Sequence, residues 1–126
     1  MTPSIQQAVE EIRSAYPGHS VDVEDDGAGG AFVKVHDLLI GDQYVPPVSW
    51  IAFRITFQYP LADVYGHYCV PNLARRDNVP LGQGFSQQVW RGEPATMMSR
   101  RSNHLNPALD TAAFKLAKVL DWMRSL

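Results

Sequence analysis

A strict alternation of apolar and smaller or polar side chains in the middle of the chain constrains the fold most. Between residues 51 and 57, every second side chain is large and apolar: Ile51, Phe53, Ile55 and Phe57. A period of two is the period of a β-strand, and β-branched and aromatic residues pack well on a pleated surface. The sequence therefore predicts a central strand over residues 50–58. Tyr59-Pro60 ends it, because proline has no backbone N–H for a sheet.

The residues before this strand predict one helix and two further strands. Thr2-Pro3 has the composition of a helix N-terminus, and apolar residues recur at helical spacing up to Tyr16. A short alternating segment follows at residues 21–23, then a connection rich in glycine and carboxylates, then a strand over residues 32–40 that has room for a bulge at Asp37. The connections are too short for parallel crossovers, so we predict a helix over residues 3–16 and an antiparallel meander of three strands.

The pattern weakens after Pro60 and becomes clear again only near the C-terminus. Residues 64–70 can form a short fourth strand or an irregular segment, and the thirty residues that follow read as a long loop that carries Trp90. Asn106-Pro107 then predicts a final amphipathic helix over residues 107–124. We therefore expect a single α+β domain over residues 1–126, with an N-terminal helix, a three- to four-stranded antiparallel meander, a long loop and a C-terminal helix.

Charge and hydropathy argue against two classes of partner. The formal net charge is −2 and the sequence pI is about 6.0, so no overall positive field attracts nucleic acid. The apolar runs are far shorter than the ~20 residues that cross a membrane. One cysteine cannot form an intrachain disulfide and fits a reducing compartment, which favours a cytoplasmic protein.

Four short motifs run from the end of the predicted central strand toward the C-terminus, in this order: Phe57-Gln-Tyr-Pro60, Gly82 to Gly84, Ser99-Arg-Arg-Ser-Asn-His104 and Pro107-Ala-Leu-Asp110. With the order of the predicted elements, they resemble the ubiquitin-conjugating (UBC-like) fold and, more narrowly, the bacterial UBC-like group called prokaryotic family E. The resemblance covers roughly residues 30–123. It implies a protein that accepts a ubiquitin-like protein as a thioester from an adenylating (activating) enzyme and passes it to an amine, without a cofactor.

The same resemblance implies a catalytic set of Cys69, His67 and Asn72. Cys69 is the only thiol, and the turn-rich stretch after Pro60 is expected to expose it. His67 would orient the thiol or accept a proton, and Asn72 would stabilise the oxyanion. In eukaryotic relatives this asparagine belongs to a His-Pro-Asn motif before the cysteine, whereas here Pro71-Asn72 follows it.

That difference leaves a second interpretation open. Free cysteine is among the most buried residue types, so Cys69 can equally be a structural residue of a non-catalytic UBC-like protein-binding module. Candidate partner-binding residues are then Trp90, Arg100, Arg101 and His104.

Each of these candidates has a structural alternative. Trp90 can anchor the loop by packing, and the two arginines can form ion pairs with Asp110 and Asp121. A zinc site of His67, Cys69 and His104, or a cysteine hydrolase, has no motif in its favour, and no metal is expected. The oligomeric state is left open.

Overall fold

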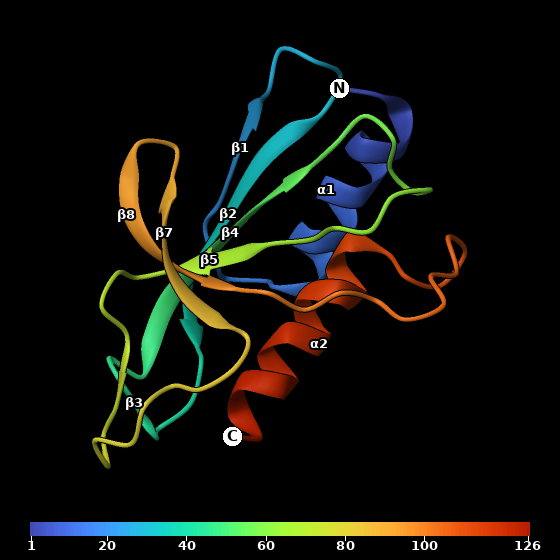
Figure 1. Cartoon of the computed structure of the whole chain (residues 1–126). Coiled ribbons are helices and arrows are strands. Elements are labelled where there is room, and N and C mark those ends of the chain that lie inside the picture. Colours follow the sequence, from blue (N-terminus) through green and yellow to red (C-terminus); the bar gives the residue numbers. More distant parts are fainter.

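Two helices cover one face of a six-stranded antiparallel sheet in the computed structural model, which describes all 126 residues (Figure 1). The elements in chain order are α1 (Pro3–Ala15), β1 (Val21–Asp25), β2 (Ala31–Leu39), β3 (Tyr44–Val45), β4 (Val48–Ile55), β5 (His67–Cys69), β6 (Ala74–Arg75), β7 (Phe85–Trp90), β8 (Glu93–Met98) and α2 (Ala112–Arg124). The strand order in the large sheet is β1-β2-β4-β5-β8-β7, and β3 pairs with β6 in a separate two-stranded ribbon. The predicted α+β class, with a helix at each end of the chain, is confirmed.

The predicted central strand is β4, which lies between β2 and β5 in the sheet. Ile51, Phe53 and Ile55 have no exposed surface, as the alternation predicts. The strand ends at Ile55 rather than at residue 58, because the chain turns there and Tyr59 N–H donates to the Thr56 carbonyl at 3.0 Å. Phe57 therefore leaves the core face and is 60% exposed.

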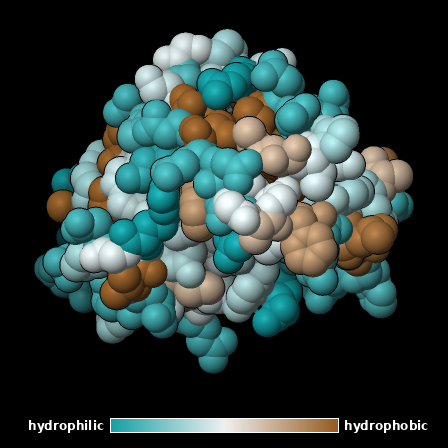
Figure 2. Space-filling model, turned by 90° about the horizontal axis from the view of Figure 1, so that it is seen from above, coloured by the Kyte–Doolittle hydropathy of each residue, from teal (hydrophilic) through white to brown (hydrophobic).

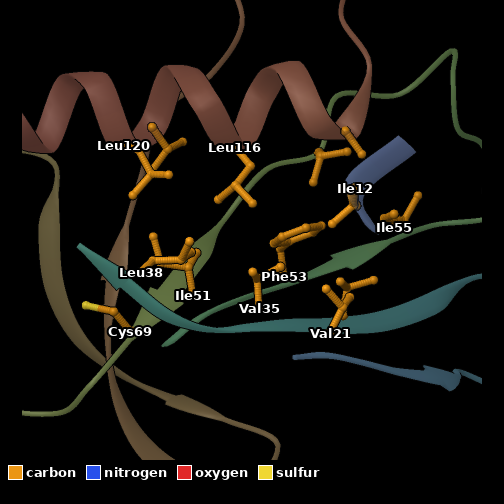
Figure 3. Packing of buried hydrophobic residues seen from close by; sticks show 14 of the residues in the cluster. Ile12, Val21, Val35, Leu38, Ile51, Phe53, Ile55, Cys69, Leu116 and Leu120 are labelled. Carbon is orange, nitrogen blue, oxygen red and sulfur yellow. The ribbon is translucent and has the colours of Figure 1, made fainter. Parts of the chain in front are cut away.

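The core fills the space between β2, β4 and the two helices (Figure 3). Helix α1 contributes Ile5 and Ile12, and α2 contributes Leu116, Leu120 and Met123, all at most 2% exposed. Each side chain of this size stabilises the fold by roughly 1.5–3 kcal/mol through burial of apolar surface. The possible bulge in β2 is also confirmed, since the β2–β4 register shifts between Val35 and Leu38 and Asp37 has a φ of 58°.

The predicted meander is correct but incomplete. Strands β1, β2, β4 and β5 form four consecutive antiparallel neighbours, with β5 only three residues long. The segment predicted as a long loop contains the β7–β8 hairpin, which adds two strands beyond β5. A two-residue turn at Arg91-Gly92, with both φ values positive (48° and 87°), joins these strands and matches the twist of the sheet.

Helix α2 begins later than its predicted start at residue 107. The Thr111 side chain caps it by accepting from Phe114 N–H, and residues 106–110 form turns held by Asn106 and Asp110. Both Asn106-Pro107 and Thr111 have the composition of a helix start, and the structure uses the second. Neither helix is long and apolar enough to cross a membrane.

Candidate functional site

Cys69 lies inside the core rather than in an exposed turn. It belongs to β5, where it pairs with Thr96 of β8, and it has no exposed surface. Figure 3 shows it on the helix-facing side of the sheet, in the same apolar cluster as Leu38 and Ile51. Burial raises the pKa of its thiol to about 12, so the sulfur is a protonated thiol at neutral pH. The expectation that the turn-rich stretch exposes the sulfur is wrong, because Cys69 lies in a strand paired on both edges and its side chain joins the apolar core.

His67 shares the buried face of β5 with Cys69, but no hydrogen bond joins them. Its ring packs on Phe53 with centroids 5.0 Å apart, and neither Nδ1 nor Nε2 has a hydrogen-bond partner. Burial, followed by the positive charge of Lys115, lowers the pKa of His67 to about 3, against the opposite effect of Asp63. The imidazole is therefore neutral and has no exposed surface.

Asn72 lies outside this buried region, in the turn after β5. It has a φ of 57° and an exposed side chain that makes no hydrogen bond, while its N–H donates to Gln87 Oε1 at 3.2 Å. An exposed amide and a buried thiol do not share a surface that a substrate can reach. The structure thus brings Cys69 and His67 onto one face and leaves Asn72 apart from them.

A second polar cluster, which the sequence analysis did not identify, joins the buried Lys115 to the half-buried Asp63 and Ser102. Lys115 Nζ donates to both carboxylate oxygens of Asp63, at 3.1 and 2.9 Å, and to Ser102 Oγ at 2.9 Å. Ser102 also donates to Asp63 through its N–H at 2.7 Å and its hydroxyl at 2.9 Å. Burial alone raises the pKa of Asp63, but these hydrogen bonds and the lysine charge outweigh it and hold the pKa below its usual value.

This arrangement favours a structural role for the three residues. An ammonium that is paired with a carboxylate is not a base, so Lys115 cannot activate Ser102 as a nucleophile. The contacts instead attach two loops to α2. The one sequence signal was the position of Lys115, three residues after Ala112 on the apolar face of the helix, where it is 3% exposed.

Trp90 packs against the face of the sheet that the helices leave free. Its ring lies 4.9 Å from that of Tyr68 and 5.8 Å from that of Phe32, measured between centroids. Beside it, Arg91 pairs with Glu24 of β1 (Nη1–Oε2 2.7 Å) and lies 4.2 Å over the Phe32 ring. These contacts bring the hairpin tip back over β1 and β2.

A groove of about 400 Å³ lies between the hairpin tip and strands β1, β2 and β4. Aromatic side chains and charges line it together, among them Phe32, Lys34, Trp50, Trp90 and Glu93. We call this depression the Trp90 groove. Its size and mixed lining are those of a binding site for a small molecule or for a short segment of a protein.

The other three candidate partner-binding residues lie away from this groove. Arg100 stacks on Trp122 of α2 at 4.8 Å and Arg101 on Tyr65 at 4.0 Å, while His104 is exposed in the loop before α2. Neither arginine forms an ion pair, and Asp110 pairs instead with Lys118. Trp122 belongs to the helical layer, so Arg100 and Trp90 lie on opposite sides of the sheet.

No three His, Cys, Asp or Glu side chains converge into a group that could hold a metal ion. The surface seen from above in Figure 2 has small apolar areas separated by hydrophilic side chains rather than one large apolar patch. Comparisons of the chain with family models, with curated proteins and with solved structures found no match.

Proposed function

We propose that this chain is a non-catalytic UBC-like protein-binding module in which Cys69 is a structural residue. The observation that carries the proposal is the position of the sulfur, which belongs to the apolar core and has no exposed surface. A thioester carrier presents a thiolate to a bulky activating enzyme and then to an amine. Here the thiol is protonated, and the apolar core encloses it.

The UBC-like part of the proposal is supported by the order of the elements. An N-terminal helix precedes a meander of four strands, β1-β2-β4-β5, and the chain closes with a helix on the same face of the sheet. The Phe57-Gln-Tyr-Pro60 motif follows the third strand of this meander, β4, as the resemblance requires. The β7–β8 hairpin is an addition to that order.

The Trp90 groove is the surface that we assign to the protein partner. Two tryptophans and a phenylalanine line it, and aromatic residues are enriched where proteins bind one another tightly. The resemblance suggests a ubiquitin-like protein or its activating enzyme as the partner. The competing interpretation, a thioester carrier, requires the core around Cys69 to open before the sulfur can react.

Thiol accessibility tests the proposal directly. The native protein is mixed with N-ethylmaleimide, and modification is followed by intact mass, with and without urea. The control is a Cys69→Ala protein that carries Val79→Cys, because Val79 is 55% exposed. We expect Cys69 to react at least about 100-fold more slowly than the control cysteine in the native protein, and at the same rate in urea.

Two results would overturn the proposal. One is modification of native Cys69 at a rate close to that of the control cysteine. The other is a reductant-sensitive adduct that depends on Cys69 and forms with the adenylating enzyme, a ubiquitin-like protein and ATP.

A further inference from the structure

The six-stranded sheet has two edges, and one of them is protected against pairing with another strand. Strand β1 carries carboxylates at Asp22, Glu24 and Asp25, which repel a second copy of the same edge. One of its outward carbonyls, that of Val21, also accepts a hydrogen bond from Arg13 at 3.2 Å. Charged side chains and occupied backbone groups are the usual protection of an edge strand.

The other edge, β7, has neither kind of protection. Its sequence, Phe-Ser-Gln-Gln-Val-Trp, contains no charged residue and no proline. Figure 1 shows the β7–β8 hairpin at the side of the sheet, with β8 as the only strand paired to β7. Residues 87–89 are exposed.

The hydrogen bonds of the hairpin establish which backbone groups of β7 point outward. Ser99 N–H donates to the Gly84 carbonyl at 2.8 Å, and hydrogen-bonded pairs alternate along an antiparallel ladder. The N–H and C=O groups of Ser86 and Gln88 therefore face β8. Those of Phe85, Gln87 and Val89 face away from it, and none of them has a hydrogen-bond partner in the protein.

These three outward residues are symmetric about Gln87. A two-fold axis midway between the two strands, level with Gln87, places Gln87 opposite Gln87 of a second copy. The same axis places Phe85 of each copy opposite Val89 of the other. All outward N–H and C=O groups then pair in one register. Val89, which is 62% exposed, gains an apolar neighbour in Phe85, whose ring is held in place by stacking on Trp122 at 4.9 Å.

We propose that β7 pairs with β7 of a second copy of this chain, so that two six-stranded sheets become one continuous sheet. The second copy is the occupant that the strand favours, because β7 is uncharged and its register is self-complementary. Pairing of β7 with β1 of another copy would produce open chains and would meet the carboxylates of β1. The inference does not depend on the role of Cys69.

Sedimentation velocity of the full chain over a range of about 5–500 µM tests the proposal. We expect a monomer–dimer equilibrium without larger species. Val89→Lys places a charge beside Phe85 of the second copy and should raise the dimer dissociation constant at least about tenfold. Val79→Lys is the matched control, since Val79 is also exposed but lies outside every strand, and it should leave the constant unchanged.

Amide hydrogen exchange adds a measurement that only this register explains. As the protein concentration rises, exchange at Phe85, Gln87 and Val89 should slow, whereas Ser86 and Gln88, already bonded to β8, should not change. Val89→Pro removes one outward N–H without touching the β8 ladder and should also weaken the dimer. A monomer throughout the concentration range, a dimer equally tolerant of both lysine variants, or protection without this alternation would each overturn the proposal.

Discussion

Lys115 Nζ lies 2.9 Å from Asp63 Oδ2 and so joins the buried face of α2 to the loop that follows β4. Ser102 completes the cluster from the loop that precedes α2. The chain segments before β5 and after β8 are thereby attached to the helix by polar contacts, in addition to the apolar packing of Tyr59 and Val64 in the core. A buried ion pair is a poor source of net stability, but removal of one partner leaves the other charge uncompensated.

Asp63→Ala should therefore be costly, while Lys115→Met should be mild. The first variant leaves an ammonium that is 3% exposed without its carboxylate, and we expect a loss of about 2–4 kcal/mol in the free energy of unfolding. The second replaces the lysine with an apolar side chain of similar length. It leaves behind a carboxylate that is 19% exposed and still accepts two hydrogen bonds from Ser102, so the loss should be less than about 1.5 kcal/mol. Urea unfolding at pH 7 measures both losses.

Lys118→Met is the control, because the ion pair of Lys118 with Asp110 is partly exposed and should contribute at most about 1 kcal/mol to the free energy of unfolding. Equal losses for Asp63→Ala and Lys118→Met would contradict this account.

His67 should make the protein less stable as the pH falls below neutrality. Its pKa is about 3 in the folded protein and about 6.5 when unfolded, so the unfolded state binds more protons between these values. The stability from a neutral His67 is complete above pH 6.5 and falls by about 1.4 kcal/mol per pH unit below it. His67→Leu removes this dependence without breaking a hydrogen bond, since the ring nitrogens have no partner.

The comparison needs only two pH values. Between pH 7.5 and pH 5, the wild type should lose about 2 kcal/mol more than His67→Leu in the free energy of unfolding. The other histidines are present in both proteins, so their titration cancels. Asp63 does not interfere, because its lowered pKa confines its titration to more acidic solution. Parallel pH profiles for the two proteins would show that His67 is not buried in its neutral form.

Gly84 should tolerate alanine much less well than Gly82. Both residues have positive φ, 90° and 86°, so alanine is strained at either position. A Cβ on Gly84 would lie 2.8 Å from Trp122 Cζ2, whereas a Cβ on Gly82 has no atom within 4 Å. We expect Gly84→Ala to cost about 1–2 kcal/mol more than Gly82→Ala and to alter the near-UV circular dichroism of the tryptophans, because Trp122 must move from its stack on Phe85. Equal effects of the two variants on stability would mean that Trp122 does not pack against Gly84.

The local sequence pattern was sufficient to predict a helix or strand where one face of that element packs against the core. The alternation at Ile51, Phe53 and Ile55 predicted β4, and the helical spacing after Pro3 predicted α1 to within one residue at its end. The β7–β8 hairpin was missed because its strands meet the core only in part. Every residue of β7 is exposed or half-exposed, and Gly92 and Pro94 give the segment the composition of a loop.

The site was harder to predict than the fold because it depends on contacts between distant segments. Whether Cys69 is exposed depends on β5 becoming an inner strand through its pairing with β8, and on core residues of α2, both of which come much later in the chain. No residue close to Cys69 in the sequence indicates that pairing. The buried pair of Asp63 and Lys115 is likewise invisible from either segment alone, apart from the unusual position of a lysine on an apolar helix face.

The substitutions Cys69→Ala and Cys69→Ser should separate a structural cysteine from a reactive one by stability alone. In the core, alanine removes the sulfur from a site without exposed surface and should cost about 1–2 kcal/mol. Serine should cost about 1–2 kcal/mol more than alanine, because it buries a hydroxyl. The nearest acceptor for the thiol, the Val70 carbonyl, lies 3.8 Å from the sulfur, which is too far for a hydroxyl hydrogen bond. At an exposed catalytic position the serine and alanine variants would be equally stable, since a serine hydroxyl in contact with water carries no burial cost. Urea unfolding of the three proteins at pH 7 gives the result, and a serine variant as stable as the alanine variant would mean that the side chain at position 69 reaches solvent.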